Sequence, residues 1–390
     1  MRHLVLFLSL SAAALQAQWV TGYWLNPPDS NLPVAAIDYS ALTHVIQYSV
    51  LPNGDGSLNA VSLANATASA PALIAAAHAH GVKVLLSFAA TSSGGDFYDA
   101  TAPATLSTFV DNIFNVLTTY GYDGVDIDWE QQIDGLQFQN LVSSLRSRLD
   151  APPFANPGKE TTIRERRRGY TQHGLLTGAF YQPAYYLTAV AGSFDQINVE
   201  TYDMCSPDDG FTWHNAALYD AGVSAYRSVQ WRMGLFAASG IPPSKLGVGI
   251  PFYGYLWQGG SGTSTGGVTE PGQGWTTAPS MNYLDYHSIV GNSSLWQTAY
   301  QQRDVAAGNV PYLSIATSSD AGDMFITYDD ETSVAAKVAY AHANGFGGIM
   351  IYELSGDYSP GANPQSPLLA AVKTAVFAAQ TTPLARPDRK

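Results

Sequence analysis

The sequence has 390 residues, of which 46% are hydrophobic and 13% are charged, and its formal net charge is −13. This apolar content is enough for one large core and differs from that of a disordered or collagen-like chain. Nucleic acids are excluded as partners because binding them requires a basic surface that displaces counterions. Aromatic residues make up 12% of the sequence. Their rings could stack on sugars, but composition alone favours a role in core packing.

The first residues predict a secretory signal. Met1–His3 is a short basic start, Leu4–Leu15 is apolar, and small residues follow up to Ala17. An apolar run this short does not anchor a chain stably in a bilayer. We therefore expect a signal peptide at residues 1–17, a secreted or periplasmic location, and no membrane association after cleavage. No later run is expected to cross a membrane.

From Val20 onward, short β-rich runs alternate with helical patterns. The predicted strands are Val20–Trp24, His44–Val50, Lys83–Phe88, Gly124–Trp129, Leu175–Tyr181, Gln196–Tyr202, Leu246–Phe252 and Gly348–Tyr352. The predicted helices include Ala70–His80, Ala104–Tyr120, Leu136–Leu149 and Thr332–Asn344. Eight strands separated by helices predict an α/β fold in which parallel units close into a (β/α)8 TIM barrel. The alternative, an open doubly wound sheet, would need a Gly-rich phosphate turn after the first strand, and Gly22–Leu25 is not one.

One interval interrupts this alternation. The roughly seventy residues between Tyr253 and Phe325 are too many for a βα loop. We therefore expect a small α+β insertion lobe at residues 255–326, between strand seven and helix seven of a barrel domain that spans 18–380. The Pro-rich, polar residues 381–390 are expected to form a flexible tail.

The most informative segment is Asp123–Glu130, which reads Asp-Gly-Val-Asp-Ile-Asp-Trp-Glu. Because side chains alternate between the faces of a strand, Asp126, Asp128 and Glu130 share one face and the intervening apolar residues share the other. We expect the carboxyls to line the barrel interior toward its C-terminal end. Three carboxyls this close cannot all ionise cheaply, so the pKa of at least one should be raised. A carboxyl that keeps its proton near neutral pH can act as a general acid.

A solvated acidic edge and a metal cage are the alternatives to a catalytic role for this segment. A solvated edge is disfavoured because Ile127 and Trp129 require burial. A metal cage is disfavoured because the sequence has no H-x-x-x-H or similar cluster. No metal and no cofactor are expected.

Asp123–Glu130 resembles the D-G-x-D-x-D-x-E signature of glycoside hydrolase family 18, and the resemblance covers nearly the whole chain after residue 17. The further segments that resemble the family are Phe194–Met204, Trp213–Tyr219, Lys245–Gly254, Asn282–Tyr286, Val310–Asp329 and Gly345–Asp357. Among them are the Tyr202-Asp203 pair and the Gly-x-Pro-x-Tyr-Gly turn that includes Tyr253.

The resemblance implies a chitinase that cleaves β-1,4-linked N-acetylglucosamine in chitin or chitooligosaccharides. With the predicted signal peptide, we expect a secreted enzyme, and we expect it to be a monomer. It implies a retaining mechanism in which the acetamido group of the substrate is the nucleophile and forms an oxazolinium ion. Glu130 would be the acid and then the base, and Asp128 would turn between Asp126 and the acetamide. Tyr202 would bond the acetamide carbonyl. The sugar-binding residues that the resemblance implies are Tyr23, Asp203, Trp213, Tyr253 and Tyr352. Glu200 is expected to join them.

The sequence departs from the family pattern at several positions. The third strand ends in Ala89-Ala90 where Gly-Gly is usual, so two methyl groups are expected to narrow the floor near the carboxyls. Glu200 replaces a Met and is expected to place another carboxyl near the site. Tyr352 stands where Trp is common but should still form the hydrophobic floor. Tyr255 stands where Arg is frequent.

Two other functions remain open on the sequence. One is an endo-β-N-acetylglucosaminidase that cuts N-glycans, against which the insertion lobe weakly favours a chitinase because it would wall one side of a long cleft. The other is a non-catalytic sugar-binding protein on the same barrel. That class typically loses the terminal acid, whereas this sequence keeps Glu130.

Two remaining features are expected to be structural. The basic run Arg164–Arg168 is typical of a solvated loop. Cys205 is the only cysteine, so no internal disulfide can form, and we expect it to be a small buried hydrophobic residue.

Overall fold

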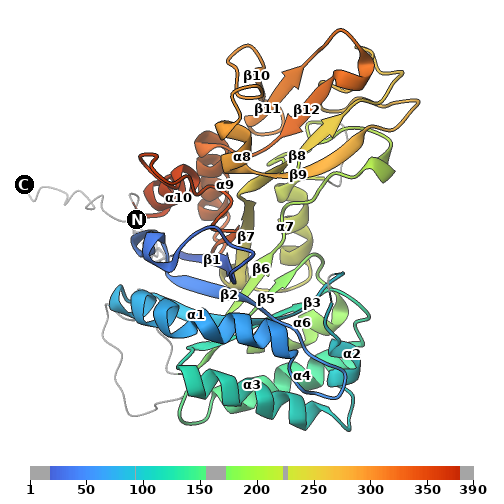
Figure 1. The fold of residues 1–390 in the computed structure, drawn as a ribbon. Helices are drawn as coiled ribbons and strands as arrows, with labels where there is room; N and C mark the ends of the chain where they lie inside the picture. The colour runs from blue at the N-terminus through green and yellow to red at the C-terminus, as the bar shows by residue number, and fades with distance from the viewer. Residues whose placement is uncertain (1–17, 93, 155–172, 223–226, 378–390) are drawn as a thin grey trace, which may run out of the picture.

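The computed structural model describes residues 18–92, 94–154, 173–222 and 227–377 (Figure 1). The predicted signal peptide at 1–17, the basic run Arg164–Arg168 and the predicted tail at 381–390 lie outside the described residues. They stay predictions.

Eight parallel strands form a closed barrel, which confirms the predicted fold class. Each strand pairs with its neighbours in the order β1-β13-β7-β6-β5-β4-β3-β2. The barrel strands are β1 Trp19–Leu25, β2 His44–Val50, β3 Lys83–Ala90, β4 Gly124–Trp129, β5 Leu175–Phe180, β6 Gln196–Val199, β7 Leu246–Pro251 and β13 Gly348–Tyr352. Because all eight strands run in one direction, their carboxyl ends open at one mouth, where functional side chains of such barrels gather.

Helices surround the barrel and cover the outward faces of its strands (Figure 1). They are α1 Ala60–Ala79, α2 Phe97–Ala100, α3 Leu106–Tyr120, α4 Gly135–Leu149, α6 Tyr185–Val190, α7 Val229–Ala238, α9 Glu331–Ala343 and α10 Pro367–Phe377. Short 3-10 turns lie at η1 Val34–Ala36, η2 Tyr39–Ala41, η3 Ala191–Ser193, η4 Pro207–Asp209, η5 Pro243–Lys245 and η6 Asp320–Gly322. Helix α3 ends at Gly121, whose φ of 84° is the left-handed conformation that glycine adopts without strain and that turns the chain into β4.

Helix α1 is longer than the sequence pattern predicts, beginning at Ala60 rather than Ala70. Its first turn is fixed by Asn59, whose side chain accepts hydrogen bonds from the backbone of Val61 and Ser62. By length and composition alone α1 could cross a membrane, which corrects the expectation that no later run has that character. It nevertheless packs along β2 and β3 as one of the barrel helices.

The inserted lobe is built on a five-stranded antiparallel sheet of order β10-β11-β12-β8-β9. Its elements are β8 Tyr253–Gln258, β9 Ser280–Asp285, α8 Tyr286–Gly291, β10 Gln301–Asp304, β11 Val310–Ile315 and β12 Met324–Thr327. Strand β8 starts directly after β7, so the lobe rises from the C-terminal end of the barrel (top of Figure 1). The antiparallel sheet between β7 and α9 agrees with the predicted lobe. The exact boundaries 255–326 and 18–380 stay predictions.

A buried ion pair stabilises the segment where the chain passes from the lobe back to the barrel. Lys337 on α9 is fully buried, and its Nζ lies 2.6 Å from Oδ1 of Asp329, which follows β12. The Ser333 hydroxyl donates to the same oxygen at 2.6 Å. Burial lowers the pKa of Lys337, and the charge of Asp329 opposes that shift. The charge of Asp329 therefore helps to keep the buried Lys337 charged.

Replacing Lys337 by Met should lower the free energy of unfolding by about 3–5 kcal/mol, because Asp329 is left buried without its counter-charge. Combining Lys337→Met with Asp329→Leu should restore most of the loss, because no unpaired charge then remains. Denaturant unfolding of the three proteins measures both effects. A double variant as unstable as Lys337→Met would show that the pair does not act as described.

Candidate active site

Strand β4 carries the carboxyl residues to the barrel mouth as the alternation predicts. Asp126 is 0% exposed and Asp128 is 5% exposed, whereas Glu130 follows the end of the strand and is exposed. The apolar residues between them face the helices and belong to the main core. Trp129 stacks on Phe97 of α2 with ring centroids 4.9 Å apart. This packing fixes which face of β4 points into the barrel.

Asp126 lies deepest and is surrounded by hydroxyl donors from three other strands. The hydroxyl of Tyr23 donates to its Oδ2 at 3.0 Å, and those of Ser87 and Thr177 donate to its two oxygens at 2.9 and 2.6 Å. Burial raises the pKa of Asp126 to about 6, and these hydrogen bonds oppose the shift. Both of its oxygens are therefore occupied by the protein.

Asp128 has one occupied and one unoccupied oxygen. The Tyr48 hydroxyl donates to Oδ2 at 2.9 Å. Oδ1 is buried and has no hydrogen-bond partner among the residues that the structure describes. Burial and the charge of Glu130 raise the pKa of Asp128 to about 8, and the hydrogen bond from Tyr48 opposes the shift. A buried acceptor without a donor is costly, so Oδ1 is suited to receive an N–H or O–H from a ligand.

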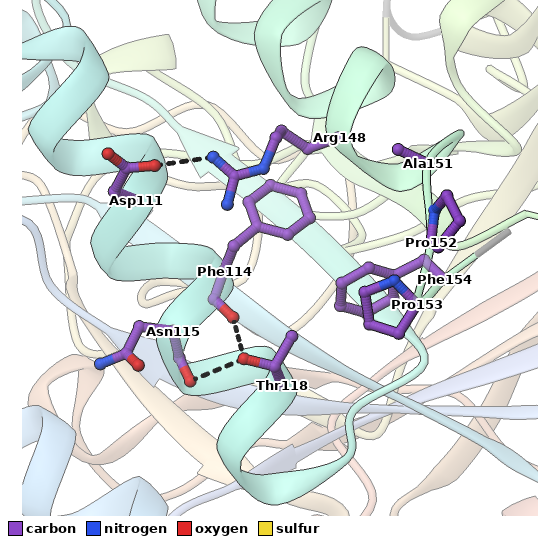
Figure 2. Close-up of a pocket in the computed structure, with 9 residues that line it drawn as sticks. All are labelled: Asp111, Phe114, Asn115, Thr118, Arg148, Ala151, Pro152, Pro153 and Phe154. Atoms are coloured by element: carbon purple, nitrogen blue, oxygen red, sulfur yellow. Dashed lines mark hydrogen bonds and ion pairs between the residues drawn. The ribbon is translucent and has the colours of Figure 1, made fainter.

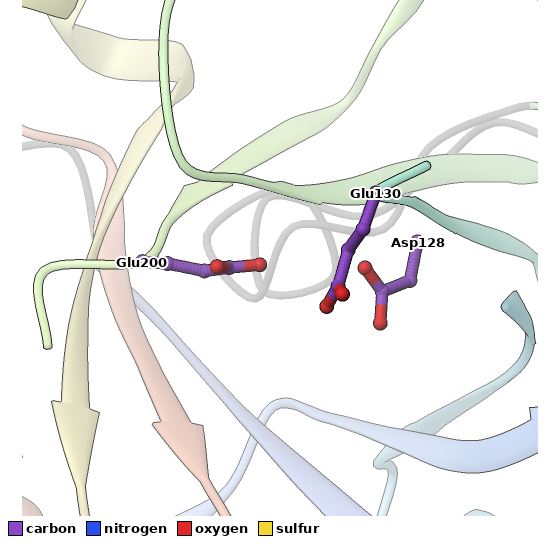
Figure 3. A group of neighbouring side chains, drawn as sticks. All are labelled: Asp128, Glu130 and Glu200. Carbon is purple, nitrogen blue, oxygen red and sulfur yellow. The ribbon is translucent and has the colours of Figure 1, made fainter. Parts of the chain in front are cut away.

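Glu130 lies at the mouth beside Asp128 and Glu200 (Figure 3). One carboxylate oxygen of each of the three residues lies within 4.8 Å of the other two. Partial burial and the charge of Asp203 raise the pKa of Glu130. An accessible carboxyl that keeps its proton at a higher pH than an ordinary glutamate is suited to donate that proton to a ligand.

The carboxyl triad of Asp128, Glu130 and Glu200 could also surround a cation. Three carboxylate oxygens suit Ca²⁺ or Mg²⁺ better than zinc, but such ions take six or more oxygen ligands. No His or Cys joins the group within the described part of the chain. We therefore derive no metal chemistry from it.

Strand β6 is shorter than predicted and ends at Val199 rather than Tyr202. The chain turns away because the Thr201 hydroxyl donates to the carbonyl of Gly249 on β7 at 2.6 Å. Asp203 has a φ of 53° and is held by a hydrogen bond from its N–H to Asn215 Oδ1 at 2.8 Å. The predicted residues Tyr202 and Asp203 thus reach the site from a loop, not from the strand.

Asp203 connects this loop to the inserted lobe. Its Oδ1 accepts hydrogen bonds from the hydroxyls of Tyr253 and Tyr255, at 2.6 and 2.8 Å. Both tyrosines lie on β8, the first strand of the lobe. Tyr255, which stands where the family pattern has Arg, therefore belongs to the site.

Five tyrosines form a contiguous aromatic floor around the carboxyls. Tyr352 lies among them, half-buried, with its ring centroid 5.7–6.4 Å from those of the other four. The other members are Tyr23, Tyr48, Tyr202 and Tyr253. The role of Tyr352 as the floor beneath a sugar stays a prediction. Tyr48 is absent from the predicted site, although His44, Ile46 and Tyr48 alternate along β2 and share its inward face.

The predicted role of Trp213 as a sugar-binding residue is wrong. It is 0% exposed, its Nε1 donates to the carbonyl of Arg227 at 2.9 Å, and it packs with Cys205 and Trp257 in the core beneath the lobe. A side chain enclosed in this way cannot stack on a sugar. Cys205 is buried in the same cluster, as expected of a small hydrophobic residue.

The two alanines at the end of β3 point to opposite faces. Ala89 lies in register with Asp128, on the face that carries the carboxyls. Ala90 lies in register with Trp129 and packs in the helix-facing core. Only the Ala89 methyl therefore borders the site, which corrects the expectation that both narrow the floor.

A separate hollow of about 280 Å³ lies between α3, the end of α4 and residues 151–154 (Figure 2). Its wall includes the ion pair of Arg148 with Asp111 at 2.7 Å, and Arg148 also covers the Phe114 ring. These helix ends lead into the amino ends of the barrel strands. The hollow therefore lies at the opposite end of the barrel from the carboxyls.

The family profile described as "Glycosyl hydrolases family 18" matches residues 20–357. The chain is 31% identical to chitinase A1 of Niallia circulans over 71% of its own length and 41% of that protein's length. It is 28% identical to the class V chitinase of Arabidopsis thaliana, over 91% of its own length and 90% of that protein's length. The chain therefore spans less than half of the first relative and most of the second.

Solved structures show the same fold. The group IV chitinase of Ostrinia furnacalis in complex with allosamidin matches with a TM-score of 0.74 and 23% identity, over 94% of this chain and 100% of that one. A family 18 N-acetylglucosaminidase from Paenibacillus barengoltzii matches with a TM-score of 0.71 and 24% identity, over 92% and 99%.

The buried carboxyl of Asp128 should make stability depend on pH. Its pKa is about 8 in the folded protein and 3.8 ordinarily, so between these pH values the folded state binds more protons than the unfolded state. The stabilisation is therefore present at pH 4 and lost as the pH rises through 8. Asp128→Asn should remove this loss and raise the free energy of unfolding at pH 8, relative to pH 4, by on the order of 5 kcal/mol.

Denaturant unfolding at pH 4 and pH 8 measures this difference. Asp99→Asn, at an exposed position of α2, is the matched control and should behave as the wild type. An equal pH dependence in wild type and Asp128→Asn would contradict the description of Asp128.

Proposed function

The chain belongs to family 18 of the glycosyl hydrolases, and from this premise we propose that it cleaves β-1,4-linked N-acetylglucosamine in chitin or chitooligosaccharides. Relatives named chitinases support this substrate class. The observation that carries the proposal is the buried, unpartnered Oδ1 of Asp128 next to the accessible carboxyl of Glu130. This pair offers one acceptor for an acetamide N–H and one acid for the neighbouring glycosidic oxygen.

In the first step, Glu130 donates its proton to the glycosidic oxygen as the bond from that oxygen to C1 breaks. The acetamido carbonyl oxygen of the same sugar forms a bond to C1 and gives an oxazolinium ion. When Glu130 carries the proton, its charge no longer raises the pKa of Asp128. The ionised Asp128 then accepts the acetamide N–H through Oδ1, which orients the carbonyl oxygen and balances the positive charge. No protein carboxylate has to attack C1.

In the second step, Glu130 is ionised and acts as the base. It takes a proton from a water molecule whose oxygen attacks C1, and the bond between C1 and the acetamide oxygen breaks. The sugar leaves with its original configuration at C1, because C1 has been attacked twice. The proton from this water leaves Glu130 protonated again, ready to act as the acid in the next cycle.

The neighbouring residues of the site suit this substrate. The hydroxyl of Tyr202 lies 3.8 Å from Met350 Sδ, a weak acceptor, so the acetamide carbonyl would be a better partner for it. Tyr352 offers a half-buried ring under the sugar. Tyr23 does not bind the sugar through its hydroxyl, because that hydroxyl donates to Asp126. It acts on the site through Asp126.

Export from the cell is part of the proposal and rests on the apolar run Leu4–Leu15 alone. The preference for chitin over an N-glycan core is also proposed. Product analysis on chitin, soluble chitooligosaccharides and a high-mannose glycopeptide, side by side, tests it. Cleavage of the glycopeptide alone would favour an endo-β-N-acetylglucosaminidase.

Glu130→Gln should lower kcat on a chitooligosaccharide by roughly 10²–10⁴-fold, because the amide cannot protonate the leaving oxygen. Binding should persist because the floor and Asp128 are intact, and calorimetric titration of the variant with the oligosaccharide measures it. Exposed Glu270→Gln makes the same chemical change in the lobe and should retain full activity. Near wild-type turnover by Glu130→Gln would refute Glu130 as the acid.

Asp128→Asn should also lower kcat strongly, because the amide cannot accept the acetamide N–H through a charged oxygen or balance the oxazolinium charge. Turnover of a substrate with a reactive aryl leaving group isolates this effect, because such a group needs little help from the acid. The variant should stay slow on that substrate, whereas Glu130→Gln should recover in part. Full activity of Asp128→Asn would contradict the oxazolinium route.

A further inference from the structure

Glu200 is a residue of the site that the proposed mechanism leaves without a role. It follows β6, it is half-buried, and its carboxyl lies within 4.8 Å of those of Asp128 and Glu130. In Figure 3 it points toward Glu130 from the side opposite Asp128. The family pattern has Met at this position, so the third carboxyl distinguishes this chain from that pattern.

The three carboxyls receive few hydrogen bonds from the protein. Tyr48 donates to Asp128 at 2.9 Å. In the part of the chain that the structure describes, no donor reaches the side-chain oxygens of Glu130 or Glu200. Three partly desolvated carboxyls at this separation cannot all be ionised near neutral pH without a large repulsive cost. The group must therefore retain at least one proton, which can pass among its members.

Positive charge does little to relieve this repulsion. Arg232 on α7 donates to the backbone carbonyl of Glu200 at 2.7 Å rather than to its carboxyl, and its guanidinium lies 3.6 Å from the centroid of the Tyr181 ring. The titratable groups that act on Glu200 or feel its charge are Asp128, Glu130, Tyr202, Asp203, Arg232 and Tyr352. Burial and the charges of Asp128 and Glu130 raise the pKa of Glu200, and Arg232 opposes the shift.

We propose that Glu200 is a positioning residue for Glu130, with which it shares a proton, so that Glu130 still carries a proton at a pH where it would be ionised beside a neutral side chain. The inference rests on the proposed function, in which Glu130 is the acid. Two interacting acids lose their last proton at a higher pH than either acid alone. Glu200 therefore extends the activity of the enzyme toward higher pH and does not itself contact the scissile bond.

The test is the pH dependence of kcat/KM on a soluble chitooligosaccharide. In Glu200→Gln and Glu200→Met, the midpoint of the basic limb should fall by about 1 pH unit, because the neighbouring ionisable group is gone. Glu200→Asp keeps a carboxyl and should keep part of the wild-type profile. Glu270→Gln removes an exposed carboxyl of the lobe and should leave the limb where it is.

A direct titration separates this inference from the proposed function. In protein labelled with ¹³C at the glutamate carboxyl carbon, the Glu130 signal should titrate at a higher pH in wild type than in Glu200→Gln. Assignment uses Glu130→Gln, in which that signal is absent. The inference would be overturned if Glu130 titrated with the same midpoint in wild type and in Glu200→Gln. It would also be overturned if Glu200→Gln and Glu200→Met were active and the basic limb of their pH profiles had not moved. A wild-type protein that hydrolyses no chitooligosaccharide would refute the proposed function, and the titration would still decide whether the proton is shared.

Discussion

The arrangement of the site depends on one constraint: a single strand carries carboxyls into the interior of the barrel, where water cannot solvate their charge. Burial of an unpaired carboxylate is costly, so the barrel supplies compensating groups. Around Asp126 these are three hydroxyls, contributed by Tyr23 on β1, Ser87 on β3 and Thr177 on β5. Such donors converge because the sheet closes on itself, and an open sheet would not bring β1 and β5 to the same carboxyl. Barrel closure is thus a condition for the chemistry.

The number of hydroxyl groups that donate to each carboxyl falls from the barrel interior toward its mouth. Asp126 accepts three hydroxyl hydrogen bonds, Asp128 accepts one, and Glu130 accepts none within the described residues. The deepest carboxyl is therefore held by the protein, and the outer two are left to interact with a ligand and with each other. This gradient allows a strand of buried carboxyls to form a site that can move a proton.

Much of the barrel and of the candidate site could be predicted from local sequence, because the period of a strand fixes which residues share a face. The alternation along β4 places Asp126 and Asp128 inside the barrel, and the same rule applied to β2 finds Tyr48. The rest depends on contacts between segments distant in the sequence. Strand β6 ends early because Thr201 bonds to Gly249 on the next strand, and no local pattern reports that contact. The enclosure of Trp213 is equally invisible in local sequence, because it depends on the lobe packing over that side chain.

The hydrogen bonds from Tyr253 and Tyr255 to Asp203 make the first strand of the lobe part of the wall of the site. The lobe and the barrel therefore cannot be regarded as interchangeable modules. A chimera that exchanged the lobe beyond β8 would keep both tyrosines and the orientation of Asp203. One that cut at the end of β7 would remove them and leave a carboxylate at the mouth without its two donors. The junction that preserves both hydrogen bonds thus lies after Gln258, inside the lobe, and not at the predicted boundary of residue 255, which falls within β8.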